Sequence, residues 1–203
     1  MRKPSSVIQW SFSLLVAGTL VFNGTGHVWA KDPQILRVAE GADKAPHAII
    51  KTKFGEMEVV FFPALAPKHV ESFLSLARKG FFNGTIFHRV MPGFMIQGGD
   101  PNTKDPSKIR AYGTGGPGYT LPAEFNKIPH ERGILSAART ADPNSAGSQF
   151  FIMVAKSPHL DGQYTVFGEV IKGIKVADKV VSQPRTRRDL PLERIEITVE
   201  VMD

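Results

Sequence analysis

The chain contains no cysteine. This absence excludes a disulfide framework, a thiol nucleophile and a zinc site built from thiolates. It also excludes a lipid attached through cysteine after the apolar run near the start of the chain. It leaves the redox compartment undetermined, because a protein without cysteine is safe in an oxidising or a reducing environment.

Several catalytic and cofactor signatures are also missing. The six histidines show no metal-ligand spacing, and there is no Gly-x-Ser-x-Gly sequence, although a serine hydrolase triad is not excluded by sequence alone. Residues 113–118 satisfy the dinucleotide pattern G-x-G-x-x-G, but Pro117 and Pro122 oppose the helix that this pattern requires. Residues 100–105 begin like a calcium loop, but a lysine replaces a ligand and an aspartate replaces the required glycine. We therefore expect neither a metal nor a cofactor.

The first thirty residues are typical of a secretory signal peptide. Arg2 and Lys3 form a basic start, residues 7–22 are mostly apolar, and Val28-Trp-Ala30 offers a small-x-small cleavage site. The alternative is an uncleaved membrane anchor, but the run is short for a span of about 20 residues. We expect cleavage before Lys31 and no stable membrane insertion afterwards. The protein would then be exported, to the periplasm or, as an alternative, secreted.

The rest of the chain carries little net charge. The formal charge is +6, and because residues 1–30 hold two basic and no acidic residues, +4 remains after cleavage. The densest basic patch contains Arg185, Arg187 and Arg188. A nucleic-acid surface is one interpretation of this patch. We favour a solvated loop and expect no nucleic-acid partner, because no aromatic residue interleaves the patch to stack on bases.

The remaining sequence indicates one domain. The chain has 203 residues, of which 42% are apolar and 22% charged, values that are ordinary for a globular protein. Residues 31–46 are expected to form an extended lead-in, and residues 47–203 the domain. Hydrophobic periodicity predicts helices over residues 67–79 and 174–181. The strand candidates are two strands within 48–62, then 85–90, 94–97, 133–138, 149–154, 165–170 and 195–201.

One segment stands out chemically. Residues 87–100 read Phe-His-Arg-Val-Met-Pro-Gly-Phe-Met-Ile-Gln-Gly-Gly-Asp, so Arg89 is the only arginine in a stretch that is mostly apolar or glycine. Arginine is rarely buried without a partner. This pattern favours an apolar surface with one five-donor cation directed across it. The alternatives are an ordinary strand surface residue or an ion pair.

These residues resemble the cyclophilin family of peptidyl-prolyl cis-trans isomerases, and the similarity extends from about Ala48 to Val201. The resemblance implies a mainly β fold, a closed eight-stranded antiparallel β-barrel capped by two α-helices. It implies an enzyme that accelerates rotation about X-Pro bonds and thereby assists the folding of exported proteins. Its partners would be unfolded or partly folded polypeptides that contain proline. We expect a monomer.

The resemblance also assigns site residues one by one. It implies catalytic roles for Arg89, Phe94 and Gln97, with Gln149 helping to hold Arg89. Strand alternation places Met95 and Gln97 on one face and Phe94 on the other, so the chain must bend near Pro92 for all three to serve one site. The residues implied to bind substrate are Met95, Gly113, Ala138, Arg139, Gln149, Phe151, His159, Leu160 and Tyr164.

Three departures from the common family pattern matter. Residues 139–144, Arg-Thr-Ala-Asp-Pro-Asn, resemble the bacterial exported (periplasmic) branch of the family. His159 stands where cyclosporin-sensitive members have tryptophan, and Tyr164 stands where a histidine is often found. We therefore expect isomerase activity with weak cyclosporin binding. Two other functions are weighed beside the enzyme. One is a non-enzymatic module that holds proline-containing segments, which Arg89 disfavours, and the other is a surface chaperone or adhesin with an incidental pocket.

Overall fold

The computed structural model describes residues 45–202. The predicted signal peptide and most of the predicted lead-in, residues 1–44, lie outside the described residues. The α-helices are α2 (Pro67–Arg78) and α3 (Ile174–Val181), and both were predicted from periodicity. The strands are β1 (His47–Thr52), β2 (Gly55–Phe61), β3 (Thr85–Ile86), β4 (Arg89–Met91), β5 (Met95–Gly98), β6 (Ile134–Ala137), β7 (Phe150–Met153), β8 (Val166–Lys172) and β9 (Glu196–Met202).

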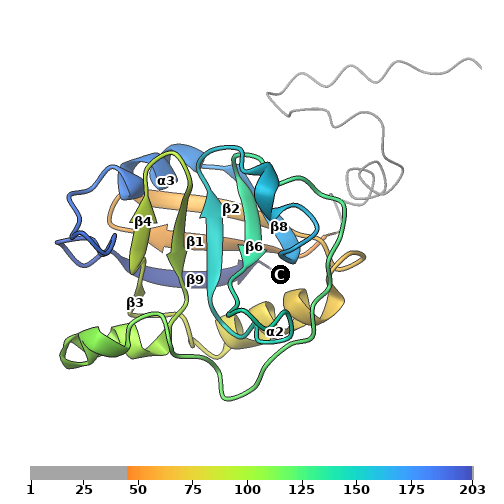
Figure 1. Ribbon diagram of the computed structural model, residues 1–203, viewed down its shortest axis with the longest axis horizontal. Coiled ribbons are helices and arrows are strands. Elements are labelled where there is room, and N and C mark those ends of the chain that lie inside the picture. The colour runs from red at the N-terminus through yellow and green to blue at the C-terminus, as the bar shows by residue number, and fades with distance from the viewer. Residues whose placement is uncertain (1–44, 203) are drawn as a thin grey trace, which may run out of the picture.

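The strands form one curled antiparallel sheet in the order β3-β9-β1-β2-β8-β6-β7-β5-β4. In Figure 1, β4 and β6 stand in front of β1, β2 and β9 and run across them. The expected closed barrel of eight strands is wrong. The sheet has nine strands and forms a half-barrel, because its two edge strands, β3 and β4, do not pair with each other in the part of the chain described.

The extra strand arises where we predicted one continuous strand over residues 85–90. The Phe87 amide donates to the Ile195 carbonyl at 3.1 Å, beside β9, whereas the His88 amide donates to the Gln97 carbonyl at 3.0 Å, on β5. The backbone thus changes its partner strand between these two residues. The segment therefore divides into β3 and β4, one at each edge of the sheet.

Each helix buries one apolar stripe against the half-barrel. Pro67 begins α2, and Val70, Phe73, Leu74 and Ala77 are buried at the spacing of one helix face. This helix contacts β8 and β9, whereas α3 contacts β2, β4 and β5, so that the helices lie at opposite ends of the sheet (Figure 1). No helix within residues 45–202 combines the length and apolar character needed to cross a membrane.

Strand alternation divides the apolar residues into two cores. Ile96 of β5 and Phe150 and Ile152 of β7 join the main core inside the half-barrel. Their neighbours Met95 and Phe151 point to the other face and join a smaller core outside it. The smaller core is completed by segments that lie over the outer face, including the 3-10 helix η4 (Pro158–Leu160), which the sequence analysis missed. The candidate site lies on this outer face.

Candidate active site

A pocket of about 170 Å³ opens on the outer face of β4, β5, β6 and β7. This volume is small beside the roughly 300–1,000 Å³ of sites for drug-sized ligands. It therefore suits one small side chain of a larger partner. Nine residues line it, and all nine are among the predicted site residues: Arg89, Phe94, Met95, Gln97, Ala138, Arg139, Phe151, Leu160 and Tyr164.

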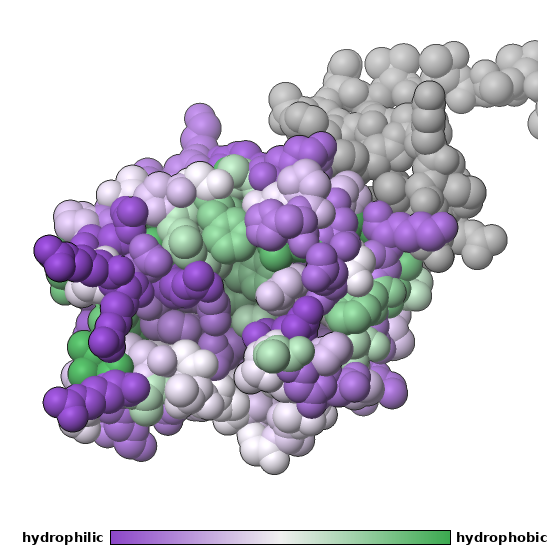
Figure 2. All heavy atoms as spheres, viewed as in Figure 1, coloured by the Kyte–Doolittle hydropathy of each residue, from purple (hydrophilic) through white to green (hydrophobic). Residues whose placement is uncertain are grey.

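The floor of the pocket is apolar and buried. Met95, Phe151 and Leu160 are exposed by only 2%, 5% and 6%, although they line a pocket that is open to the surface. Figure 2 shows the result as a hydrophobic hollow with hydrophilic residues around its rim. A ring without polar atoms can enter this hollow and release water from the apolar floor.

The turn between β4 and β5 brings Phe94 to the same site as its strand neighbours. The Phe94 amide donates to the Met91 carbonyl at 3.0 Å, and Gly93 takes the left-handed backbone angle φ of 74° that this turn requires. Phe94 therefore precedes β5, and the alternation of side chains along that strand does not determine the direction in which Phe94 points. The predicted bend near Pro92 is confirmed in the form of a hairpin turn.

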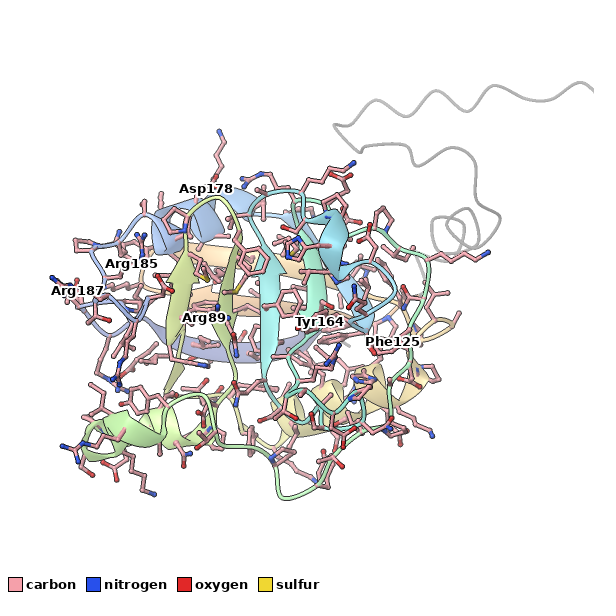
Figure 3. All side chains as sticks on the ribbon, in the orientation of Figure 1. Arg89, Phe125, Tyr164, Asp178, Arg185 and Arg187 are labelled. Atoms are coloured by element: carbon pink, nitrogen blue, oxygen red, sulfur yellow. The ribbon has the colours of Figure 1, made fainter. Side chains whose placement is uncertain are left out.

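Arg89 projects from β4 directly opposite Gln97 of β5. Its Nη1 lies 3.5 Å from the Gln97 Oε1, which is a long hydrogen bond. Within residues 45–202, the Arg89 side chain takes part in no ion pair. The guanidinium stands over the hollow in Figure 3, with most of its five N–H groups available to a bound molecule.

A chain of amides supports this arrangement from behind. The Gln97 Nε2 donates to the Gln149 Oε1 at 3.0 Å, and the Gln149 Nε2 donates to the Gly115 carbonyl at 2.9 Å. Gln149 thus lies behind Gln97 and not beside the pocket. Its contact with Arg89 is indirect, through Gln97.

Arg139 is held differently from Arg89. Its Nε and Nη2 donate to the Gln163 carbonyl at 3.0 and 2.9 Å, and its Nη1 donates to the Thr140 carbonyl at 2.8 Å. The guanidinium also stacks over the Tyr164 ring at 4.5 Å. Most of its donors are therefore engaged by this chain's own backbone, and Arg139 forms a wall of the pocket together with Tyr164.

The two remaining predicted residues, His159 and Gly113, lie outside the lining of the pocket. The His159 ring lies 5.8 Å from the Phe94 ring, at the outer end of the site. The Gly113 amide donates to an Asp100 carboxylate oxygen, at the start of the segment that leads to Gly115. Neither residue lines the pocket itself.

Sequence analysis missed His130, which supports the pocket wall. Its ring stacks on Phe151 at 6.0 Å, its Nδ1 lies 3.0 Å from an Asp161 carboxylate oxygen, and its Nε2 lies 3.1 Å from the Ser136 hydroxyl. Burial lowers the pKa of this imidazole, although Asp161 opposes the shift. No spacing in the sequence indicates this cluster, since its members come from separate loops and strands.

Comparison with known proteins agrees with this geometry. The model of the family described as "Cyclophilin type peptidyl-prolyl cis-trans isomerase/CLD" matches residues 47–201. A probable peptidyl-prolyl cis-trans isomerase of Brucella abortus is 46% identical over 149 residues, which cover 71% of this chain and 76% of that protein. A peptidyl-prolyl cis-trans isomerase of Synechococcus elongatus is 43% identical over 143 residues, 66% of this chain and 92% of that one.

A solved structure is also similar to most of this chain. The cyclophilin-type peptidyl-prolyl cis-trans isomerase of Cryptosporidium parvum superposes with a TM-score of 0.71 at 32% identity, covering 78% of this chain and 98% of that one. The sequence comparison and the structure comparison thus indicate the same family. The family match spans residues 47–201, and the two relatives are 46% and 43% identical to this chain over the aligned residues, so this chain belongs to the cyclophilins and is a peptidyl-prolyl cis-trans isomerase.

Proposed function

We propose that the pocket binds the proline ring of a polypeptide and that Arg89 accelerates rotation about the preceding peptide bond. The observation that carries this proposal is the position of Arg89, which faces Gln97 above a floor of buried apolar side chains and has no carboxylate partner in the described chain. A proline ring on that floor would present its peptide bond to the guanidinium.

The energetic demand on such a site is moderate. Rotation about a peptide bond meets a barrier of about 18–20 kcal/mol, because it breaks amide resonance. Uncatalysed X-Pro exchange takes roughly 10–100 s. A turnover of about 10²–10³ s⁻¹ therefore needs a barrier lower by about 4–7 kcal/mol. No covalent bond forms and no proton moves, so a positioned donor and an apolar pocket are sufficient chemistry.

Arg89 would act on the twisted form of the bond. As resonance is lost, the prolyl nitrogen regains its lone pair and becomes a hydrogen-bond acceptor. A guanidinium that donates to this nitrogen binds the twisted bond more tightly than the planar one, which lowers the barrier. Donors in comparable oxyanion sites contribute about 3–4 kcal/mol. The apolar floor would contribute further, because the planar amide is the more polar form and loses more by leaving water.

The proposed substrates are polypeptides that contain proline. A second structure of the Cryptosporidium parvum relative, with a TM-score of 0.70 and 32% identity, was obtained in the presence of the dipeptide Ala-Pro. The use of this dipeptide with a relative supports the same class of ligand here. The open pocket would admit a proline within an extended chain, which is how unfolded and partly folded proteins present it.

A pair of matched substitutions tests the pocket. Ala138 lies on the pocket wall, whereas Ala141 is exposed and does not line it. Ala138→Phe should fill the hollow and lower kcat/KM on an X-Pro peptide by about tenfold or more. Ala141→Phe should leave it within about twofold of the wild type. A protease-coupled assay measures both, and equal rates for all three proteins would contradict the proposed binding site.

We also propose that the enzyme acts on exported proteins in the periplasm and assists their folding. The support is the sequence of residues 1–30, with its basic start, apolar run and Val28-Trp-Ala30 ending. Sequencing the amino terminus of the protein from fractionated cells tests this. A chain that begins at Lys31 in the periplasmic fraction is expected. A full-length chain in the cytoplasmic fraction would overturn the proposal.

A further inference from the structure

The loop of residues 185–190, which we call the basic loop, has a fixed internal structure. The Thr186 amide donates to the Leu190 carbonyl at 2.8 Å, and the Asp189 amide donates to the Thr186 carbonyl at 3.0 Å. Asp189 adopts a left-handed φ of 62°, a conformation that no other non-glycine residue takes in the described part of the chain. The loop is thus a closed turn that holds its side chains in defined positions.

The basic loop is joined to the strand that carries Arg89. The Val90 amide donates to the Asp189 carbonyl at 2.8 Å, so the loop lies against the edge strand β4. In Figure 3, Arg185 and Arg187 lie on one side of Arg89, and Tyr164 lies on the other. A polypeptide that crosses the pocket and continues past β4 would meet this loop.

Two of the three arginines in the basic loop are not neutralised. Arg185 forms an ion pair with Asp189, with 3.2 Å between Nε and Oδ1. The exposed side chains of Arg187 and Arg188 take part in no ion pair or hydrogen bond found among residues 45–202. They present two positive charges to the solvent beside the site.

The pocket has the same sign of charge. Arg89 and Arg139 both line it, and no aspartate or glutamate does. The hydrogen bonds of Arg139 go to carbonyl oxygens, which leave its full positive charge in place. From the basic loop to Tyr164, this face therefore combines uncompensated guanidinium groups with a pocket for a neutral ring.

We propose that the basic loop binds acidic side chains of the client polypeptide, so that the enzyme prefers prolines that have aspartate or glutamate nearby in the sequence. This inference rests on the proposed function, since it takes the pocket as the binding site of the proline. Arg187 and Arg188 would hold carboxylates a few residues from the proline and would attract acidic segments toward the site.

Charge and composition favour a polypeptide over a nucleic acid as the occupant. Residues 185–190 include no aromatic side chain on which a base could stack. The loop is also joined, through the hydrogen bond between Val90 and Asp189, to the strand that carries the pocket residue Arg89. The carboxylates of a client chain that is already held in the pocket reach the loop without a separate binding event.

The test compares peptides that differ only in the charge beside the proline. Each test peptide contains Ala-Pro together with a Glu-Glu, Gln-Gln or Lys-Lys pair. The charged or neutral pair stands before the proline in one series and after it in another. NMR measures the rate of cis–trans exchange of each peptide in the presence of the enzyme. In at least one series the glutamate peptide should have a kcat/KM about three to ten times that of the glutamine peptide, as expected for two exposed charge contacts. The preference should fall as salt rises from about 0.05 to 0.5 M.

Matched variants locate the effect. Arg187→Gln with Arg188→Gln should remove most of the glutamate preference and change the glutamine peptide by less than about twofold. Lys68→Gln with Lys79→Gln also removes two exposed positive charges, at the ends of α2, and should keep the preference. Circular dichroism melting verifies that the variants are folded.

The outcomes separate this inference from the proposed function. If no peptide is isomerised, the proposed function fails. If the wild type isomerises glutamate, glutamine and lysine peptides equally in both series, or if the Arg187/Arg188 variant keeps the preference, the basic loop is not an acidic-segment site. Tight binding of a single-stranded oligonucleotide without any glutamate preference would likewise overturn the inference, in favour of a nucleic-acid surface.

Discussion

The side chains of Gln97 and Gln149 are joined by a hydrogen bond of 3.0 Å, in which the Gln97 amide donates to the Gln149 Oε1. This bond fixes the orientation of the Gln97 amide, so that its Oε1 faces Arg89. Because Gln149 in turn donates to the Gly115 carbonyl, the guanidinium is oriented by a row of neutral groups. A carboxylate in place of Gln97 would neutralise the charge that the proposed mechanism uses.

Removing Gln149 should lower activity less than removing Arg89. In Gln149→Leu the Gln97 Nε2 loses its acceptor, and the Gln97 oxygen is free to turn away from Arg89. The loss of one such bond, about 0.5–1.5 kcal/mol, predicts a decrease in kcat/KM of roughly two- to tenfold. The protease-coupled assay measures this. An unchanged rate would show that Gln97 needs no support.

Gly99 should be intolerant of a side chain. It follows β5 with a left-handed φ of 84°, and an added Cβ would collide with the Ser148 carbonyl oxygen. Gly99→Ala should lower the free energy of unfolding by more than about 2 kcal/mol, through backbone strain and displacement of β7. Gly84→Ala is the matched control, because its φ is 80° but nothing lies within 4 Å of the added atom. Urea unfolding should show the smaller loss for Gly84→Ala, and equal losses would refute the collision.

Two buried histidines should make the fold sensitive to mild acid. Burial lowers the pKa of His88, and burial also lowers that of His130. A histidine whose pKa is lower in the folded state than in the unfolded state binds protons preferentially when unfolded. Stability is therefore complete above the unfolded pKa of about 6.5 and decreases as pH falls through the folded pKa values. Urea unfolding between about pH 7.5 and 5.5 should show the free energy of unfolding decreasing with acid.

A substitution isolates the contribution of His88. Neither ring nitrogen of this residue has a hydrogen-bond partner in the described chain. His88→Leu should therefore fold and should show a smaller loss of stability between the same two pH values. A slope equal to that of the wild type would assign the acid sensitivity to other groups.

Cyclosporin should bind weakly, which follows from the family resemblance and from His159. The His159 ring lies beside Phe94 at the outer end of the pocket, where an imidazole offers less aromatic surface than an indole. His159→Trp should raise affinity by about three- to tenfold, the value of an added aromatic contact. A fluorescence titration measures both proteins. Submicromolar binding by the wild type would contradict the prediction.

Regular periodicity made most of the fold predictable. The alternation of Ile195, Ile197, Val199 and Val201 anticipated β9, and the apolar stripe from Val70 to Ala77 anticipated α2. The division of residues 85–90 was not predictable, because no glycine or proline marks the change of partner strand at Phe87 and His88. That change depends on distant hydrogen bonds, and it makes the difference between the expected closed barrel and the observed half-barrel.

The residues that line the pocket could be predicted from the sequence, but the contacts that hold them in place could not. The resemblance supplied all nine residues that line the pocket. It did not indicate that the guanidinium of Arg139 is bound to backbone carbonyls, that Gln149 acts through Gln97, or that His130 packs behind Phe151. Each of these contacts joins segments far apart in the chain, so local pattern carries no information about them.

The central claim is that the Arg89 guanidinium stabilises the twisted X-Pro bond, and its most direct test is kcat/KM for Arg89→Ala and Arg89→Lys in the protease-coupled assay. If the contribution is that of a positioned donor, about 3–4 kcal/mol, Arg89→Ala should lose roughly 10²–10³-fold. Arg89→Lys should also lose most of the activity, because lysine keeps the charge but lacks the planar fork. An Arg89→Ala enzyme that isomerises the peptide as fast as the wild type would contradict the mechanism.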